Sequence, residues 1–150
     1  MFSTRIRNSF PLKNDRNSRK TSEPDLSYNC FGWAAKNVLG SERCMAPVPN
    51  DYFWPLGVER SRTLASFVEA FRSLGFEVCP SSDFEEGVEK IVIYASGEYA
   101  EHAARQKPCG KWTSKLGLEE DIEHDTPEVL SGGRWGNPAV FMKRAIVTPQ

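Results

Sequence analysis

The sequence predicts an α+β fold in which N-terminal helices pack on an antiparallel sheet. Two segments with helical periodicity come first, at residues 30–39 and 63–74, and segments with the composition and turn signals of strands follow them. Helices that precede a run of strands are typical of folds with the helices on one face of the sheet. The chain of 150 residues is long enough for one domain with a hydrophobic core.

We expect residues 1–25 to form a flexible basic tail and residues 26–150 to form a single domain. Residues 1–20 carry six basic side chains and one acidic side chain, a net charge of +5, whereas the whole chain carries −1. Such an arm could contact nucleic acid or an acidic partner. A solvated tail is favoured because no aromatic residues alternate with the basic ones, and the acidic remainder of the chain makes nucleic acid an unlikely partner.

The first helix is predicted over residues 30–39. Trp33, Ala34 and Val38 recur there at helical spacing, and Gly40 follows as a typical C-terminal stop. An irregular connection with three prolines and several aromatic residues comes next, and we expect it to pack over an edge of the core or to border a cleft.

The second helix, over residues 63–74, is the clearest element of the sequence. Thr63 is a suitable N-cap, and Gly75 ends the helix. Its apolar side chains fall on one face and are expected to face the core: Leu64, Phe67, Val68, Phe71 and Leu74.

Five strands are predicted from β-branched content and from flanking turn residues. They cover residues 76–79, 90–94, 102–106, 111–114 and 139–146, and the last could lie at an edge of the sheet. Pro108 and Gly110 place a hairpin turn between the third and the fourth strand. The acidic residues 119–131 are expected to form short helical turns, one of them starting at Thr126.

The most specific chemistry that the sequence suggests is that of a cysteine hydrolase. Cys30 stands at the start of the first helix, where the backbone N–H groups lower a thiol pKa and could stabilise an oxyanion. His102 would take the thiol proton and return it to the leaving amine. A third polar group would orient the ring. Ser114 lies across the predicted hairpin, and Asp121 or His124 could substitute for it.

The residues around this cysteine resemble a known family. Residues 29–34 are similar to the helix start of NlpC/P60-type cysteine peptidases, which belong to the papain-like superfamily, and His102, Gly110 and Ser114 are similar to that family's histidine, hairpin glycine and third polar residue. The resemblance implies a papain-like fold and a peptidase or amidase acting on a peptide or peptidoglycan-type amide, or on a protein target. Deamidation and acyl transfer use the same pair of groups.

Three positions depart from the pattern of these peptidases. Asn29 replaces the usual aspartate, Phe31 replaces the usual serine, and Ser114 stands where the family has histidine, asparagine or glutamine. A serine hydroxyl stabilises an imidazolium poorly compared with a carboxylate. The alternative is therefore a non-catalytic binding or inhibitor module that keeps the fold and uses the basic arm as its contact surface.

A second resemblance covers more of the chain. Residues 28–145 are similar to an uncharacterised group of small bacterial and phage proteins, and this resemblance implies no activity. The shared motifs lie at residues 28–30, 53–55, 102–106, 112–117 and 121–124. They include Trp112, which we expect in the core or in a cleft wall.

Other classes of function find little support in the sequence. The four cysteines lack the short paired spacings of a zinc site, no phosphate-binding glycine motif is present, and we expect no cofactor. No run approaches the ~18 apolar residues of a membrane span. We expect a cytoplasmic protein with reduced thiols, although delivery as an effector or through phage lysis is compatible with the sequence. The sequence does not predict the oligomeric state.

Overall fold

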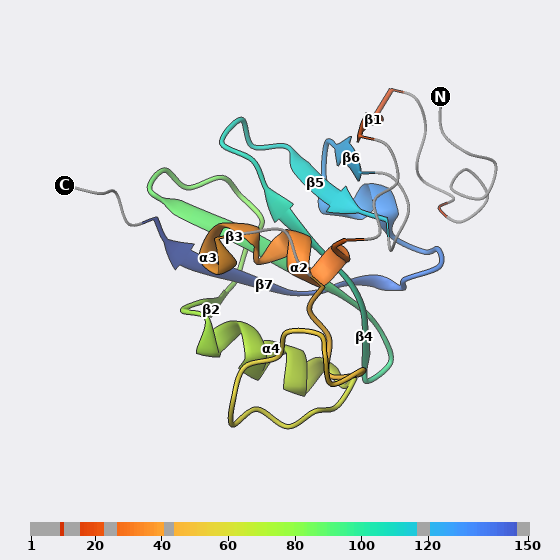
Figure 1. The fold of residues 1–150 in the computed structure, drawn as a ribbon. Coiled ribbons are helices and arrows are strands. Elements are labelled where there is room, and N and C mark those ends of the chain that lie inside the picture. The colour runs from red at the N-terminus through yellow and green to blue at the C-terminus, as the bar shows by residue number, and fades with distance from the viewer. Residues whose placement is uncertain (1–9, 11–15, 23–26, 41–43, 117–120, 147–150) are drawn as a thin grey trace.

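The structure is a computed structural model that describes residues 10, 16–22, 27–40, 44–116 and 121–146. Within these residues, seven antiparallel strands form one sheet in the order β1-β6-β5-β4-β3-β7-β2 (Figure 1). The strands are β1 (Ser18–Ser22), β2 (Glu77–Cys79), β3 (Val88–Ser96), β4 (Tyr99–Gln106), β5 (Trp112–Lys115), β6 (Asp121–His124) and β7 (Asn137–Ala145).

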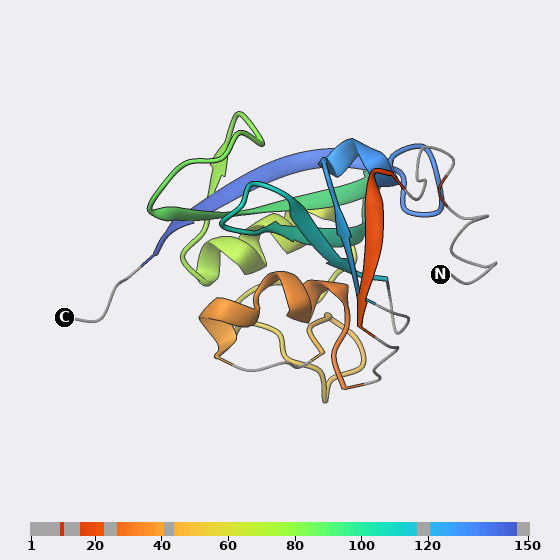
Figure 2. The same ribbon diagram turned by 90° about the horizontal axis from the view of Figure 1, so that it is seen from above.

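The helices are short. In the part of the chain that the structure describes, the α-helices are α2 (Cys30–Ala34), α3 (Lys36–Leu39) and α4 (Leu64–Ser73), and η1 (Pro127–Leu130) is a 3₁₀-helix. Figure 2 shows the three α-helices on one side of the sheet, and η1 lies on the other side. We call the first side the helix face and the second the η1 face.

The predicted papain-like α+β fold, with N-terminal helices packed on an antiparallel sheet, is wrong. The described residues are mostly a seven-stranded sheet, and only three short α-helices accompany it. The helix predicted over residues 30–39 is interrupted at Ala35, which leaves helices of five and four residues. Two of the strands, β1 and β6, lie in segments that were predicted as a tail and as helical turns.

The strands alternate between two separate cores because successive side chains of a strand point to opposite faces. On β3, Ile91 and Ile93 pack against the α-helices, whereas Val92 and Tyr94 pack on the η1 face. The hydroxyl of Tyr94 donates to the carbonyl oxygen of Pro127 at 2.6 Å, which fixes η1 to the sheet. The buried apolar residues of β3 therefore belong to one core or to the other.

Several predicted elements are confirmed. Helix α4 begins after Thr63, whose hydroxyl accepts from the N–H of Ser66 at 3.3 Å, and Gly75 follows it with a φ of +98°. The hairpin of β4 and β5 has its turn at residues 107–111, as predicted. Strand β7 is not at an edge, because β3 and β2 pair with its two sides.

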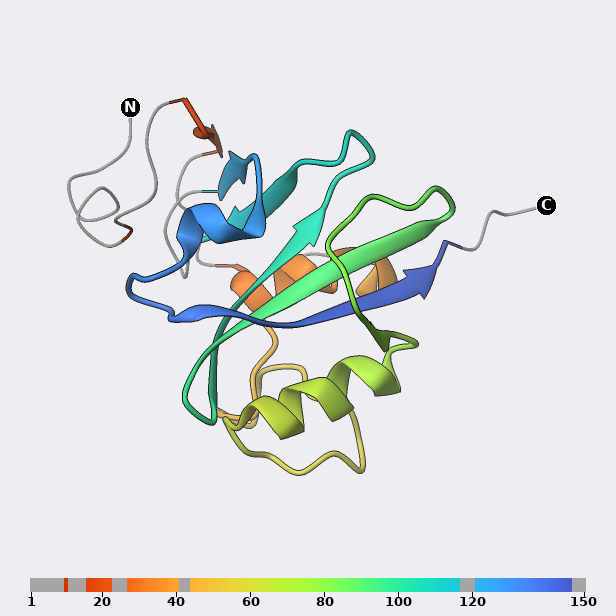
Figure 3. The same cartoon turned by 180° about the vertical axis from the view of Figure 1, so that it is seen from behind.

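Parts of the segment predicted as a tail belong to the folded body. Strand β1 pairs with β6 at one edge of the sheet (Figure 3). The guanidinium of Arg19 contacts the carboxylates of Glu123 and Asp125. Phe10 is buried, with its ring centroid 5.0 Å from that of Trp135. Residues 1–9, 11–15 and 23–25 of the predicted tail lie outside the described residues.

No helix among the described residues has the length and apolar character needed to cross a bilayer.

Candidate functional site

The predicted nucleophile is the first residue of α2 and lies in the core of the helix face. Cys30 is 6% exposed. Its burial raises the pKa of the thiol to about 12, although the backbone around Ala103 and Phe31 acts in the opposite direction. A thiol with this pKa is protonated at neutral pH, so the environment suppresses the nucleophile rather than activating it.

Asn29, which precedes the cysteine, has a structural role at the start of α2. Its side-chain oxygen accepts from the N–H of Gly32 at 2.9 Å and caps α2. The same oxygen accepts from the N–H of Met45 at 3.0 Å, and the side-chain amide donates to the carbonyl oxygen of Met45 at 2.9 Å. Asn29 thereby ties the chain around Met45 to the start of the helix.

The predicted base lies on the other face of the sheet. In the pairing of β3 with β4, Tyr94 is opposite His102 but Ala95 is opposite Ala100, so Glu101 is an extra residue, a β-bulge. The bulge puts Ala100 and Ala103 into the core that contains Cys30, and His102 on the η1 face beside Tyr94. The structure does not bring the cysteine and the histidine together.

A cavity of about 310 Å³ borders Cys30. Its polar lining includes Tyr52, Arg62 and Glu101, and no histidine is among the described residues that line it. The cavity thus lacks the imidazole that the predicted cysteine hydrolase would place near its sulfur.

The two histidines and Ser114 form a hydrogen-bonded chain across β4, β5 and β6. His102 Nε2 lies 3.0 Å from Ser114 Oγ, which lies 2.7 Å from His124 Nε2. His124 Nδ1 lies 2.8 Å from the carbonyl oxygen of Thr126 and must donate to it. It follows that neutral His124 accepts from the hydroxyl of Ser114, and that Ser114 accepts from His102 Nε2–H.

This chain is closed to solvent. His102, Ser114 and His124 are all 0% exposed, and the ring of His102 stacks on Trp135 at a centroid distance of 4.1 Å. Burial is the main cause that holds the pKa of His102 well below its usual value. His102 Nδ1 has no hydrogen-bond partner among the described residues. The chain joins three strands, and no substrate can reach it in this arrangement.

Asp121, an alternative third residue, points to the helix face and cannot orient His102. It accepts from the Tyr28 hydroxyl at 2.6 Å, and its other oxygen lies 3.9 Å from the ammonium of Lys115. Lys115 is 0% exposed, and its ammonium lies 4.9 Å from the centre of the Tyr28 ring. The sequence interpretation missed this buried cation because a lysine in a short strand usually faces water.

Trp112, predicted as core or cleft wall, is a core residue. It is 2% exposed and packs with Val92 and Ile122 on the η1 face. The four cysteines are free thiols. Within the residues that the structure places, no cluster of three or more histidine, cysteine, aspartate or glutamate side chains could hold a metal ion.

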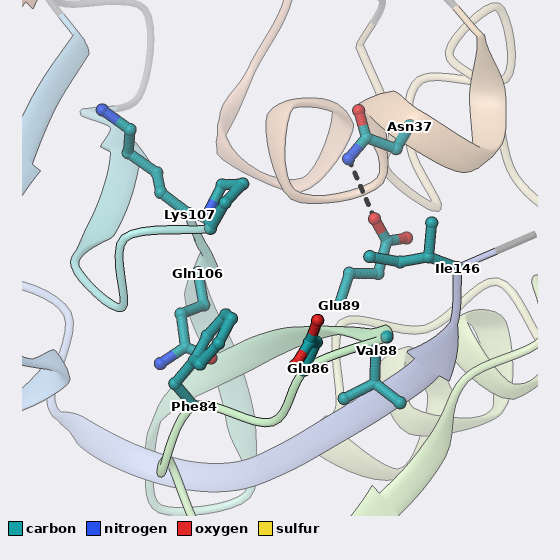
Figure 4. A pocket seen from close by; sticks show the side chains of 10 residues that line it. Asn37, Phe84, Glu86, Val88, Glu89, Gln106, Lys107 and Ile146 are labelled. Carbon is teal, nitrogen blue, oxygen red and sulfur yellow. Dashed lines mark hydrogen bonds between the residues drawn. The ribbon is translucent and has the colours of Figure 1, made fainter. Parts of the chain in front are cut away.

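The sheet has a cavity of about 420 Å³ at the end where β3 and β4 separate (Figure 4). The pairing of these strands ends at Ile91 and Arg105, whereas β3 continues to Val88 in contact with β7 alone. Val88 and Glu89 line the cavity from β3, and Gln106 lines it from β4. The separation of two neighbouring strands therefore creates the space.

The mouth of this cavity has exposed apolar residues. Phe84 is 49% exposed and Ile146 is 52% exposed, and Figure 4 shows the two side chains on opposite sides of the cavity. The sequence predicted neither residue to border a cavity, and Ile146 entered only as the end of the last predicted strand. The only feature of the sequence that could have indicated this cavity is the aromatic residue within the acidic loop at residues 83–86. A loop of this composition is usually interpreted as solvent-exposed.

Comparison with known proteins identifies a family. The model of the family described as "Domain of unknown function (DUF7689)" matches residues 19–143, so the chain belongs to this family. No curated protein and no solved structure matches the chain significantly.

Proposed function

We propose that this member of the DUF7689 family is a non-catalytic binding module. The observation that carries the proposal is the position of Cys30 and His102 on opposite faces of the sheet. A cysteine hydrolase needs an imidazole within hydrogen-bond reach of its sulfur. Here the sheet itself lies between the two groups, and no change of side-chain rotamer brings them together.

The electrostatics of both groups support the same proposal. A pKa of about 12 keeps the Cys30 thiol protonated, and His102 is neutral with its Nε2–H donated to Ser114. The pair of Ser114 and His124 has the hydrogen bond of an activated serine, but both side chains are completely buried. Neither arrangement offers a nucleophile to a substrate.

The cavity between β3 and β4 is the binding site that we assign to the module. It has exposed apolar side chains at its mouth, which are typical of interaction sites. The basic arm is a weaker choice, because Arg19 is already paired with Glu123 and Asp125 on the protein itself.

Labelling of the cysteines with iodoacetamide tests the non-catalytic assignment. Cys109 is exposed and serves as the internal reference. We expect native Cys30 to react orders of magnitude more slowly than the exposed Cys109 near pH 8, because Cys30 is buried and its burial raises the pKa of the thiol to about 12. Peptide mass spectrometry follows each site separately, and urea should equalise the two rates.

The substitution H102Q should leave the rate at Cys30 unchanged, since the histidine does not contact the sulfur. If Cys30 reacted faster than Cys109 in the native protein and more slowly in H102Q, Cys30 and His102 would form a functional catalytic dyad. This result would contradict the proposal.

A further inference from the structure

We propose that the cavity between β3 and β4 binds a peptide segment of a partner protein in which an apolar side chain is flanked by lysine or arginine. The inference rests on the proposed function, since it names the ligand class of the same site. The apolar walls of the cavity, the charges around them and the fixed position of the loop over residues 83–86 support this ligand class.

The walls can enclose an apolar side chain. Phe84 and Ile146 stand at the mouth, and Val88 and Pro108 line the cavity with them. The volume of about 420 Å³ is within the range of about 300–1,000 Å³ that is common for binding sites. Burial of the half-exposed Phe84 and Ile146 under a partner would remove apolar surface from water, which is the main source of affinity in such contacts.

The charge around the mouth is negative. Glu86, which lines the cavity, and Asp83, which precedes the lining residue Phe84, are exposed, and neither forms an ion pair with any residue that the structure describes. In Figure 4 the carboxylate of Glu86 lies among the lining side chains of the cavity. These two carboxylates are available to the cations of a partner.

The cations near the cavity already have partners. The ammonium of Lys107 points away from the cavity and donates to Glu123 at 2.8 Å. Arg144 donates to Glu89 at 2.7 and 2.8 Å, and Asn37 donates to the other oxygen of Glu89 at 2.9 Å. An acidic ligand would therefore meet Glu86 and Asp83 without a free counter-charge, whereas a basic one is attracted.

The loop that carries Phe84 is held in place by a buried lysine. Lys90 is 2% exposed, and its ammonium donates to the carbonyl oxygens of Ser81 at 3.0 Å and Asp83 at 2.6 Å. It also lies 2.7 Å from a carboxylate oxygen of Glu85. Phe84 is thus presented in a fixed position, and a partner loses less conformational entropy on binding a preorganised site.

A peptide suits this site better than an enclosed small molecule. The exposed apolar residues lie around the mouth as well as in the walls, and only a ligand that extends beyond the cavity can cover them. The expected contact is one anchoring side chain in the cavity, with flanking basic residues beside Asp83 and Glu86.

The test uses a fluorescent peptide with a leucine–tryptophan pair between two arginines on each side, titrated with the complete protein. A second peptide has glutamates in place of the arginines, and a third has a glycine–serine pair in place of the apolar residues. We expect the first peptide to bind, and each of the other two to bind about tenfold more weakly or not at all. Amide chemical shifts should move at Val88 and Gln106.

Variants of the protein separate the two contributions. E86K and F84S should each weaken the basic peptide about tenfold, by reversing a charge and by removing apolar surface, respectively. E98K and L56S are matched controls, because Glu98 and Leu56 are exposed and lie outside this cavity. Both controls should bind like the unchanged protein.

Equal binding of the glutamate peptide, or loss of binding in the control variants, would overturn the inference. Self-association of the protein that is abolished by E86K would also overturn it, because the occupant would then be a second copy. None of these results bears on the labelling of Cys30, so the failure of this inference is distinguishable from the failure of the non-catalytic proposal.

Discussion

His102 was predicted to be catalytic, but in the structure its ring has a structural role. The groups that face its ring are Tyr94 from β3, Ser114 from β5, His124 from β6 and Trp135 from the segment before β7. None of them is a carboxylate. A protonated ring would carry a buried charge without a counter-ion, and its Nδ1–H would have no acceptor among the described residues.

This environment predicts loss of stability in mild acid. The folded-state pKa of His102 is lowered, by burial first, so the folded protein resists a proton that the unfolded chain accepts near pH 6.5. Its contribution to stability is complete above about pH 6.5 and declines by up to about 1.4 kcal/mol per pH unit as the pH falls below that value. Urea unfolding between about pH 7.5 and pH 5 measures the slope.

The substitution H102Q removes the titrating group and should flatten this slope, whereas S114A keeps the histidine and should retain it. An unchanged slope in H102Q would assign the acid sensitivity to another residue. The carboxylates of Glu85 and Glu123, whose pKa values are lowered by lysine partners, do not interfere, because they lose their contribution only at a lower pH.

At the level of single residues, the sequence predicted which side chains lie next to each other across a hairpin. It did not predict on which face of the sheet a side chain lies. The spacing across the predicted hairpin put Ser114 close to His102, and the two side chains are in contact in the structure. The chemistry of a cysteine hydrolase, and not a spacing, predicted Cys30 near the ring, and the structure puts the two on opposite faces of the sheet. The extra residue at Glu101 reverses the face of everything beyond it on the strand, and a bulge leaves no mark in the order of apolar residues.

At the level of elements, the local signals were reliable where they depend on neighbouring residues. The N-cap at Thr63, the stop at Gly40 and the turn near Gly110 come from backbone chemistry within a few positions, and the structure has all three. Strand β6 was missed because three of its four residues are polar or charged, and only pairing with β1 and β5 makes them a strand.

One glycine between elements has a role that local signals do not reveal. Gly136, just before β7, has a φ of +74° and packs directly on β3. A Cβ at this position would overlap the carbonyl oxygen of Ala95 and lie 2.7 Å from its carbonyl carbon. Since the obstacle is backbone of a central strand, it cannot move aside without disturbing the sheet.

We therefore expect G136A to destabilise the protein by about 3 kcal/mol or more, from backbone strain and from the overlap together. G97A is the matched control, because Gly97 has a φ of +59° and no described atom lies within 4 Å of the position that a Cβ would take there. It should cost only the strain of about 1–2 kcal/mol. Urea midpoints give both values, and equal losses would show that the close approach to β3 is not a constraint.

At the level of the whole molecule, the sheet depends on strand pairings between segments that are far apart in the chain. Strand β1 pairs with β6 across about a hundred residues, with Ser18 opposite His124. Neither the basic charge nor the polar composition of the first 25 residues indicates this contact, because both also describe a solvated tail. Long-range pairing depends on shape and register, which no local pattern encodes.

The position of β1 leads to a last prediction, about truncation. Removal of residues 1–22 takes away a whole edge strand, the contacts of Arg19 with Glu123 and Asp125, and the packing of Phe10 on Trp135. We expect a loss of about 4 kcal/mol in the free energy of unfolding, mostly from the buried phenylalanine. The amides of β6 should lose hydrogen-exchange protection, while those of β3 stay protected.

A shorter truncation, of residues 1–17, removes Phe10 but keeps β1, and so separates packing from strand pairing. It should destabilise the protein while β6 remains protected, because the backbone of β1 still covers that edge of the sheet. If both truncations left the stability and the β6 amides unchanged, the first 22 residues would be a true tail. In that event the sheet would end at β6, and the arm would again be available as a contact surface.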